Sequence, residues 1–100
     1  MRREDTRRIL IAYDVPDDRR RTRLAKALST YGDRIQYSVF VTDMIPAKTI
    51  RLKDKIRDLI DESEDSVLFC DLGPLANLKE AKFSYIGVTR DITDNDALII

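Results

Sequence analysis

Residues 9–32, ILIAYDVPDDRRRTRLAKALSTYG, carry the strongest local pattern in the chain. The unbroken apolar run at 9–13 is typical of a buried strand, and Pro16 with the aspartates after it ends that strand. Asp17 or Asp18 is suited to cap a helix, because an aspartate side chain accepts hydrogen bonds from free backbone N–H groups. The positions that then share one helical face are Leu24, Leu28 and Tyr31. The stretch predicts a strand, a charged loop and an amphipathic helix.

The rest of the chain continues this alternation of strands and helices. RIQYSVFVTDMI at 34–45 is rich in β-branched and aromatic residues and predicts one long strand or two short strands that meet near Tyr37. A second amphipathic helix is predicted from Pro46, and SVLFC at 66–70 predicts another strand. The order predicts an α/β (α+β) sandwich, a ferredoxin-like βαββαβ fold with both helices on one face of the sheet.

The boundaries of the elements carry further expectations. Gly32 suits the left-handed residue just past the first helix, and Gly73-Pro74 marks a turn. FSYIGV at 83–88 looks like an extra C-terminal strand, and ALII at 97–100 is a short apolar end. With no repeat or linker, residues 1–100 are expected to form one domain. The bare sheet face predicts a homodimer, with 83–100 packing on the partner chain.

Composition limits the chemistry that the protein can perform. The 100 residues include 18 basic and 18 acidic side chains, so a uniformly basic coat for nucleic acid is excluded. The charge is nevertheless segregated: residues 1–50 carry 11 basic and 7 acidic side chains, and residues 51–100 carry 7 and 11. Such segregation can steer an anionic partner to one face. The absence of histidine excludes histidine-dependent nucleophile systems and a conventional zinc site.

The remaining sequence signals indicate the compartment. A lone cysteine, Cys70, excludes an intrachain disulfide and fits a reducing environment. The charged N-terminal residues 1–8 do not look like a secretory signal, and no apolar run approaches the length that spans a membrane. We expect a cytoplasmic protein without membrane contact.

Asp14, at the end of the first strand, is the candidate catalytic residue. It shares a face with Leu10 and Ala12, so it points to the open face of the sheet if Ile9, Ile11 and Tyr13 face the helices. Asp14 could simply begin the turn, or it could bind magnesium, which takes one or two carboxylates and keeps several waters. A two-fold dimer would bring two such carboxylates together around a cation. Asp71 is expected at the opposite end of the sheet, as a turn residue.

An arginine cluster follows Asp14. Its members are Arg19, Arg20, Arg21 and Arg23. Cations at a helix N-terminus oppose the helix dipole, so the cluster is either surface charge or a phosphate-binding group, since arginine forks match phosphate oxygens. Arg34 is the next candidate for phosphate binding. In the second strand segment, Ser38 and Phe40 are expected on the open face if Val39 and Val41 face the helices. Cys70 is expected to be an inert, small hydrophobic residue.

The combination YDVPDDRRRTRLAKALSTYGDRIQYSVF resembles the small CRISPR-associated protein that partners the integrase in spacer acquisition. The matching features are Tyr13-Asp14, the basic helix start at 19–23, Tyr31-Gly32 and the Gln-x-Ser-Val-Phe strand at 36–40. The resemblance covers residues 9–41, and the remainder agrees in length and element order.

This resemblance implies a ferredoxin-like homodimer whose C-terminal strand crosses to the partner chain. It implies that Asp14 of each chain faces its mate and can hold Mg²⁺ or Mn²⁺, with metal-dependent endonuclease activity on single-stranded RNA or double-stranded DNA in some members. Other members serve as a DNA-binding scaffold for the CRISPR integrase subunit. The residues that match positions tied to activity or nucleic-acid contact are Arg21, Arg23, Arg34, Ser38 and Phe40, and Tyr13 is a supporting residue beside Asp14.

Three classes of function remain after these observations. A metal-dependent phosphodiesterase in antiviral defence would use Asp14, and a scaffold would depend on the arginines and not on Asp14. A ferredoxin-like domain that binds a small ligand lacks a fingerprint motif here. A sheet that stacks RNA bases would need two or three exposed aromatic residues.

Overall fold

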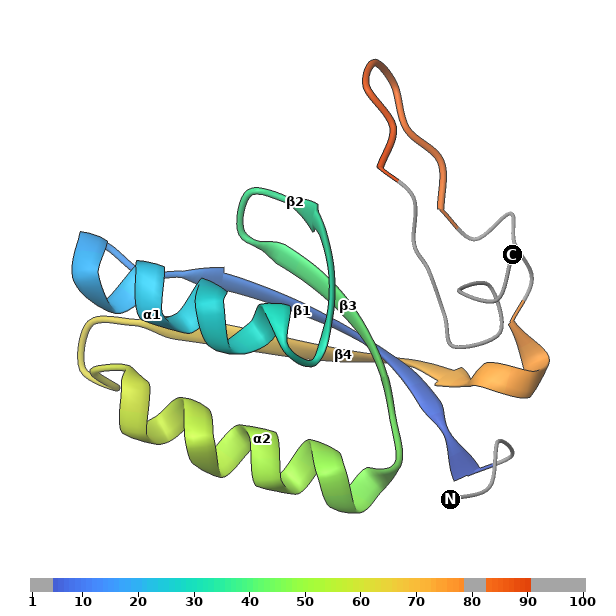
Figure 1. Cartoon of the computed structure of the whole chain (residues 1–100), viewed down its shortest axis with the longest axis horizontal. Helices are drawn as coiled ribbons and strands as arrows, with labels where there is room; N and C mark the ends of the chain where they lie inside the picture. The colour runs from blue at the N-terminus through green and yellow to red at the C-terminus, as the bar shows by residue number, and fades with distance from the viewer. Residues whose placement is uncertain (1–4, 79–82, 91–100) are drawn as a thin grey trace.

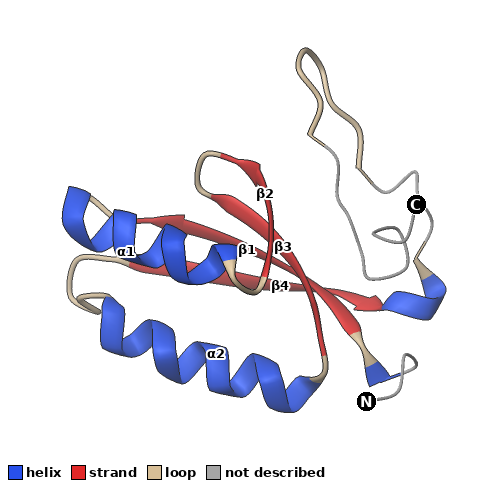
Figure 2. Ribbon diagram, viewed as in Figure 1, coloured by secondary structure: helices blue, strands red, loops and turns tan. Residues whose placement is uncertain are grey.

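The computed structural model describes residues 5–78 and 83–90, and its elements follow the predicted order (Figures 1 and 2). They are β1 (Arg7–Asp14), α1 (Asp18–Ser29), β2 (Gly32–Gln36), β3 (Val39–Met44), α2 (Pro46–Leu59), β4 (Ser66–Pro74) and a short 3-10 helix, η2 (Leu75–Asn77). The strands form an antiparallel sheet in the order β2-β3-β1-β4. The predicted ferredoxin-like βαββαβ arrangement is confirmed.

The apolar run of the first strand lies in the middle of the sheet, between β3 and β4. Ile9, Ile11 and Tyr13 are buried, whereas Leu10 and Ala12 between them are partly exposed. Successive side chains of a strand point to opposite faces, so the bulkier set faces the helices. The sequence-based assignment of the two faces of β1 is therefore confirmed.

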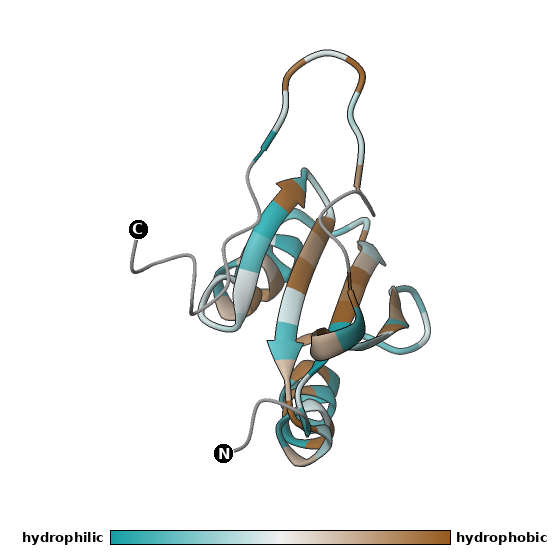
Figure 3. Ribbon diagram, turned by 90° about the vertical axis from the view of Figure 1, so that its right-hand side faces the viewer, coloured by the Kyte–Doolittle hydropathy of each residue, from teal (hydrophilic) through white to brown (hydrophobic). Residues whose placement is uncertain are grey.

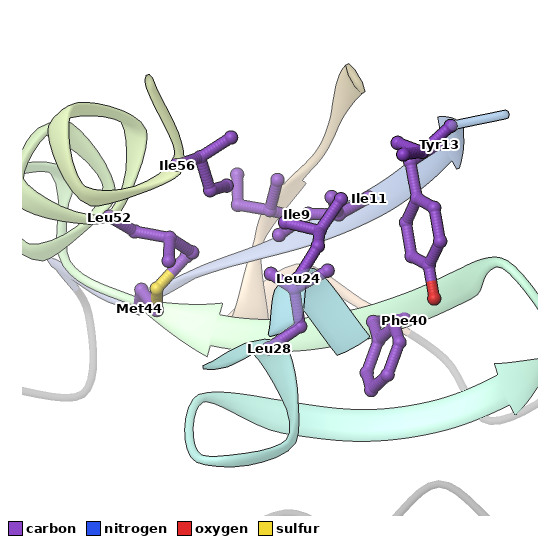
Figure 4. Close-up of a cluster of buried hydrophobic side chains, with 10 residues drawn as sticks. Ile9, Ile11, Tyr13, Leu24, Leu28, Phe40, Met44, Leu52 and Ile56 are labelled. Carbon is purple, nitrogen blue, oxygen red and sulfur yellow. The ribbon is translucent and has the colours of Figure 1, made fainter. Parts of the chain in front are cut away.

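Both helices pack on this same face and close the hydrophobic core (Figure 4). The core combines the inward side chains of β1 with residues from the two helices and from β3: Leu24, Leu28, Leu52, Ile56, Phe40 and Met44. Burying a large aliphatic or aromatic side chain stabilises the fold by roughly 1.5–3 kcal/mol. The expected face of the first helix is confirmed, since Leu24 and Leu28 are in the core and Tyr31 packs at its margin.

The two helices begin with different local signals. The Asp17 carboxylate accepts a hydrogen bond of 2.8 Å from the backbone N–H of Arg20, as a helix N-cap does. Helix α2 instead begins with Pro46 at its first position. Proline lacks a backbone N–H, and at this position the N–H would have no acceptor within the helix.

Residues 34–45 form two strands joined by a turn at Tyr37 and Ser38, and the pairing between them shifts at Arg34 and Gln36. The expected left-handed conformation of Gly32 is wrong, because among the described glycines only Gly73 and Gly87 have positive φ. Gly32 is instead the first residue of β2, where a Cβ atom would lie 2.2 Å from the carbonyl oxygen of Val41. The glycine is needed for close approach of two strands and not for a left-handed turn.

The C-terminal half departs from the sequence-based boundaries. Strand β4 continues through Gly73-Pro74, which was expected to be a turn. The segment 83–90 contains no strand, so the strand expected at 83–88 is wrong; it projects from the sheet as a loop (Figures 1 and 3), with Ile86 and Val88 highly exposed. The apolar segment 97–100 lies outside the described residues.

The face of the sheet opposite the helices carries a second set of apolar side chains. Their registers place these residues side by side across β3, β1 and β4: Val39, Val41, Leu10, Ala12, Leu68 and Cys70. Leu68 is 58% exposed and Cys70 is exposed, so Cys70 is not enclosed in the core. Within the described part of the chain, no helix has the length and apolar character needed to cross a membrane.

Candidate metal site and nucleic-acid interface

Asp14 is the last residue of β1 and its side chain is exposed. It pairs with Ser66, the first residue of β4, at the edge of the open face. Asp71 pairs with Ile9 near the other end of β1, which confirms the predicted separation of the two carboxylates, but it lies within β4 and is not the expected turn residue. The Asp71 carboxylate is already hydrogen-bonded: it accepts from the Arg7 side chain at 2.7 Å and from the backbone N–H of Gly73 at 2.8 Å.

The neighbouring carboxylates have partners, whereas Asp14 has none among the described residues. Asp17 caps α1, and Asp18 pairs with Arg21. Among the described residues, no side-chain hydrogen bond or ion pair engages Asp14. A free, hydrated carboxylate suits Mg²⁺ or Mn²⁺, because these hard cations take oxygen ligands and keep waters. Within residues 5–78 and 83–90 no three acidic, cysteine or histidine side chains gather as a metal cluster, so one chain supplies a single carboxylate here.

Arg20 is held by an acidic partner that the sequence analysis did not identify. Its guanidinium donates two hydrogen bonds to Asp65, of 2.7 Å and 3.0 Å, and the Asp65 side chain is 0% exposed. Asp65 also accepts a hydrogen bond of 2.8 Å from the backbone N–H of Asp61. The forked pair therefore fastens α1 to the loop between α2 and β4, which gives Arg20 a structural role instead of a free phosphate-binding fork.

The Arg20–Asp65 pair gives a prediction for the dependence of stability on pH. Hydrogen bonding from Arg20, above all, lowers the pKa of the Asp65 carboxyl. A carboxyl whose folded-state pKa lies below its unfolded value of about 3.9 stabilises the fold at neutral pH, and this contribution is lost as the pH falls through the folded-state pKa. We expect the melting temperature of the wild type to decrease when the pH is lowered below about 4. The Asp65→Asn protein should have a lower melting temperature than the wild type at pH 7, and its melting temperature should decrease less on acidification.

Thermal melts followed by circular dichroism at a series of pH values would measure this difference. Asp58→Asn, which removes an exposed carboxylate from α2, controls for the change of charge alone. An acid-induced fall of the same size in Asp65→Asn and in the wild type would contradict the role assigned to the pair.

The other arginines of the cluster differ in whether they have hydrogen-bond or ion-pair partners. Arg21 donates a hydrogen bond of 2.8 Å to the backbone oxygen of Val15 and pairs with Asp18. The pKa of Arg21 is raised, first by the hydrogen bond with Asp18 and then by an interaction with Tyr37. Arg19 and Arg23 are exposed, and no acidic partner lies beside either one in the described part of the chain. They are the members of the cluster left to meet a phosphate.

Phe40 and Ser38 are not on the open face, and this expectation is wrong. Phe40 is 0% exposed and its ring lies 6.3 Å from that of Tyr13, between the sheet and α1 (Figure 4). Phe40 pairs with Ile11 and therefore shares its inward face, whereas Val41 pairs with Leu10 on the open side. Ser38 belongs to the turn between β2 and β3 and accepts a hydrogen bond of 3.0 Å from the backbone N–H of Tyr13.

Tyr13 and Arg34 hold this turn close to the end of β1. The Tyr13 hydroxyl donates to the backbone oxygen of Tyr37 at 3.3 Å, and Arg34 donates to the same oxygen through two nitrogens at 2.9 Å and 2.6 Å. The Arg34 guanidinium also lies 5.0 Å from the centre of the Tyr37 ring and 5.5 Å from that of Phe40. The fold thus brings the turn beside Tyr13-Asp14, with Arg34 and Tyr37 at its surface.

Sequence reasoning missed Tyr37 and Lys26 as candidates for contact with a ligand. Tyr37 is 68% exposed in a hairpin turn, and its signal in the sequence was an aromatic residue at the bend between two strands. Lys26 lies one helical turn beyond Thr22 on α1, and its signal was a lone cation on the polar face. Neither signal indicates a site until the hairpin is placed against the helix.

Comparison with known proteins gives a consistent result. The family model described as "CRISPR associated protein Cas2" matches residues 7–77. The protein named "CRISPR-associated endoribonuclease Cas2" from a strain of Thermus thermophilus is 40% identical over 82 residues, 82% of this chain and 87% of that protein. The protein of the same name from Geobacter sulfurreducens is 35% identical over 91% of this chain and 95% of its own length.

A solved structure agrees with the sequence relatives. The crystal structure of Streptococcus pyogenes Cas2 superposes with a TM-score of 0.70 at 30% identity, over 80% of this chain and 99% of that chain. The match of the family model spans β1 through η2, which is the whole ferredoxin-like unit with Asp14 and the arginine cluster. The chain belongs to the Cas2 family of CRISPR-associated proteins.

Proposed function

We propose that the protein is a divalent-metal-dependent endonuclease of spacer acquisition that cuts phosphodiester bonds in RNA or double-stranded DNA. The single observation that carries the proposal is Asp14, exposed at the end of β1 and, like the exposed Arg19 and Arg23 that follow it in the sequence, without a partner in the described part of the chain. Relatives named endoribonucleases support a nuclease. The compartment that fits this role is the cytoplasm.

The active form that we propose is a homodimer formed across the open face of the sheet. The partly exposed Leu10, Ala12 and Val39 on that face, together with the exposed Leu68, Ile86 and Val88, supply surface that a second copy would bury. In this arrangement residues 83–100 pack on the partner chain and the two Asp14 carboxylates approach each other. Like charges at short range repel unless a cation lies between them, so the dimer would create the metal site that one chain lacks.

The residues of this chain would divide the work. The two Asp14 carboxylates would hold Mg²⁺ or Mn²⁺, which when bound stabilises the charge that develops on the phosphoryl oxygens. Arg19 and Arg23 would hold the nucleic-acid backbone, because guanidinium groups match phosphate oxygens. Tyr13 would fix the end of β1 through its bonds to the turn at Tyr37 and Ser38.

A cleavage assay tests the proposal. Single-stranded RNA and double-stranded DNA are incubated with purified protein in Mg²⁺, in Mn²⁺ and in chelator, and duplex binding is followed in parallel. We expect cutting to require a divalent cation, because in this proposal Asp14 binds the metal ion and does not act as the general base. Equal cutting in chelator would contradict a metal-dependent reaction.

A second candidate is a non-catalytic scaffold that binds duplex DNA and positions the CRISPR integrase subunit. The observation that favours it is the single carboxylate per chain, with no acidic cluster within the described residues. For a scaffold we expect the affinity for duplex DNA to decrease as the salt concentration rises. Binding should be lost when Arg19 and Arg23 are replaced by glutamine, and it should be unchanged when Asp14 is replaced by alanine. No cutting under any metal condition, with such binding retained, would favour this function.

A further inference from the structure

A polar pocket lies between helix α1 and the hairpin of β2 and β3. Its lining residues are Arg21, Thr22, Ala25, Lys26, Ser29, Arg34 and Tyr37. Its volume is about 310 Å³, close to the lower end of the range of about 300–1,000 Å³ in which small ligands bind. The pocket is therefore large enough for part of a polymer or for one compact ligand.

The charge of this lining has one sign. Arg21, Lys26 and Arg34 contribute three cations, and none of the described residues that line the pocket is a carboxylate. In the described part of the chain Lys26 has no ion-pair partner, whereas Arg21 is partly neutralised by Asp18. In a chain with equal numbers of acidic and basic residues, three cations around one hollow favour an anion, whereas the Ser29 hydroxyl already donates to the backbone oxygen of Ala25 at 2.8 Å.

Tyr37 adds a feature that a simple anion site would not need. Its ring is 68% exposed, and the Arg34 guanidinium lies 5.0 Å from the ring centre and donates two hydrogen bonds to the Tyr37 backbone oxygen. An exposed aromatic ring in a hairpin turn can be ordinary surface. A ring packed against Arg34 at a cationic pocket instead suits a nucleotide, because a base can stack on the ring while its phosphate meets the cations.

We propose that this pocket binds one nucleotide of a single strand of nucleic acid, with its phosphate between Lys26 and Arg34 and its base on Tyr37. The turn that carries Tyr37 is bonded to Tyr13, the neighbour of Asp14. The pocket is therefore linked through this turn to the end of β1. The inference deepens the proposed function by assigning a substrate-positioning site, and it requires bases that are free to leave the duplex.

Equilibrium binding in chelator tests this site without cutting. The probe is a labelled single-stranded oligonucleotide of about ten residues, followed by fluorescence anisotropy. We expect Tyr37→Ala to weaken binding about tenfold and Tyr37→Phe to change it less than about twofold, because the flat ring stacks and the hydroxyl does not. Lys26→Gln should weaken binding and reduce the slope of affinity against salt by about one.

Matched controls separate the pocket from general charge and from folding. Arg51→Gln removes one exposed cation from α2, outside the pocket, and should bind the strand more tightly than Lys26→Gln does. A duplex of the same sequence should be nearly insensitive to Tyr37→Ala, because its bases stay in the stack. Wild-type melting temperatures in Tyr37→Ala and Lys26→Gln would exclude a loss of binding through unfolding.

Three outcomes decide the proposal. Unchanged single-strand affinity in both Tyr37→Ala and Lys26→Gln overturns it, and so does an equal loss in Arg51→Gln. Competition with a mononucleotide and with inorganic phosphate identifies the source of the ligand: a mononucleotide as potent as the strand would overturn the assignment to a polymer. Binding is measured in chelator and does not depend on cutting. If Asp14 variants cut at the wild-type rate, the proposed nuclease mechanism would be disproved, but the proposed binding site would not.

Discussion

Replacing Asp14 by alanine or asparagine is expected to reduce metal-dependent cutting by more than about 100-fold, because losses of 10–100-fold already follow when only the groups around metal ligands are changed. The asparagine variant keeps the size of the side chain and removes the charge that binds the cation. Asp14 is exposed and has no partner in the described part of the chain, so neither change should disturb the fold. Initial rates of cleavage in Mg²⁺ and Mn²⁺ measure the effect.

The control for Asp14 is Glu62→Gln, which removes an exposed carboxylate from the loop before β4. That loop leads to Ser66, the partner of Asp14 across the two strands, so this variant changes charge near the same end of the sheet. Cutting at the wild-type rate by Asp14→Asn, with an unchanged melting temperature, would remove Asp14 from the chemistry. Weaker binding of duplex by Asp14→Asn would also argue against a purely metal-binding role.

The greatest loss of stability is expected from Phe40→Ala. The side chain is fully buried between the sheet and α1 and packs against the ring of Tyr13, so truncation removes buried area and leaves a cavity. Changes of this kind cost about 3–5 kcal/mol, which is a large part of the roughly 5–15 kcal/mol that holds a typical domain folded. Urea unfolding at a fixed protein concentration would measure the change in the free energy of unfolding.

Two further variants decide what Phe40 does. Phe40→Leu keeps most of the buried volume and should retain most of the stability. Tyr37→Ala removes an exposed aromatic ring from the adjoining turn and should change the free energy of unfolding little. A Phe40→Ala protein of wild-type stability that has lost nucleic-acid binding would place the ring in an interface instead of the core.

Much of the architecture could be predicted from local pattern. The alternation of Ile9, Ile11 and Tyr13 with smaller residues assigned the faces of β1, because neighbouring strand residues point in opposite directions. The spacing of Leu24 and Leu28 assigned the buried face of α1, and the residue types at Asp17 and Asp18 indicated the helix cap, which the structure places at Asp17. The same alternation placed Asp14 on the exposed side, where the structure has it.

Local pattern failed where two assignments were equally apolar. Either the valines or Phe40 could have faced the helices, since both sets are hydrophobic. The choice was made by the pairing of Phe40 with Ile11 and by the shift in pairing between β2 and β3, and a one-residue shift in register exchanges every side chain between the two faces. The prediction for Gly32 failed for a related reason. A glycine is required there because the Val41 carbonyl of a neighbouring strand lies too close for a side chain.

The order of the elements, the apolar faces of β1 and the helices, and the exposed carboxylate after the first strand all follow from the amino-acid order alone, because they depend on residues a few positions apart. The folded chain was needed to show that Arg20 binds Asp65, 45 residues away, and that Tyr37, Lys26 and Arg34 surround one pocket. The charge and shape of a side chain are local properties, whereas its partner is chosen by the packing of elements that are distant in the chain.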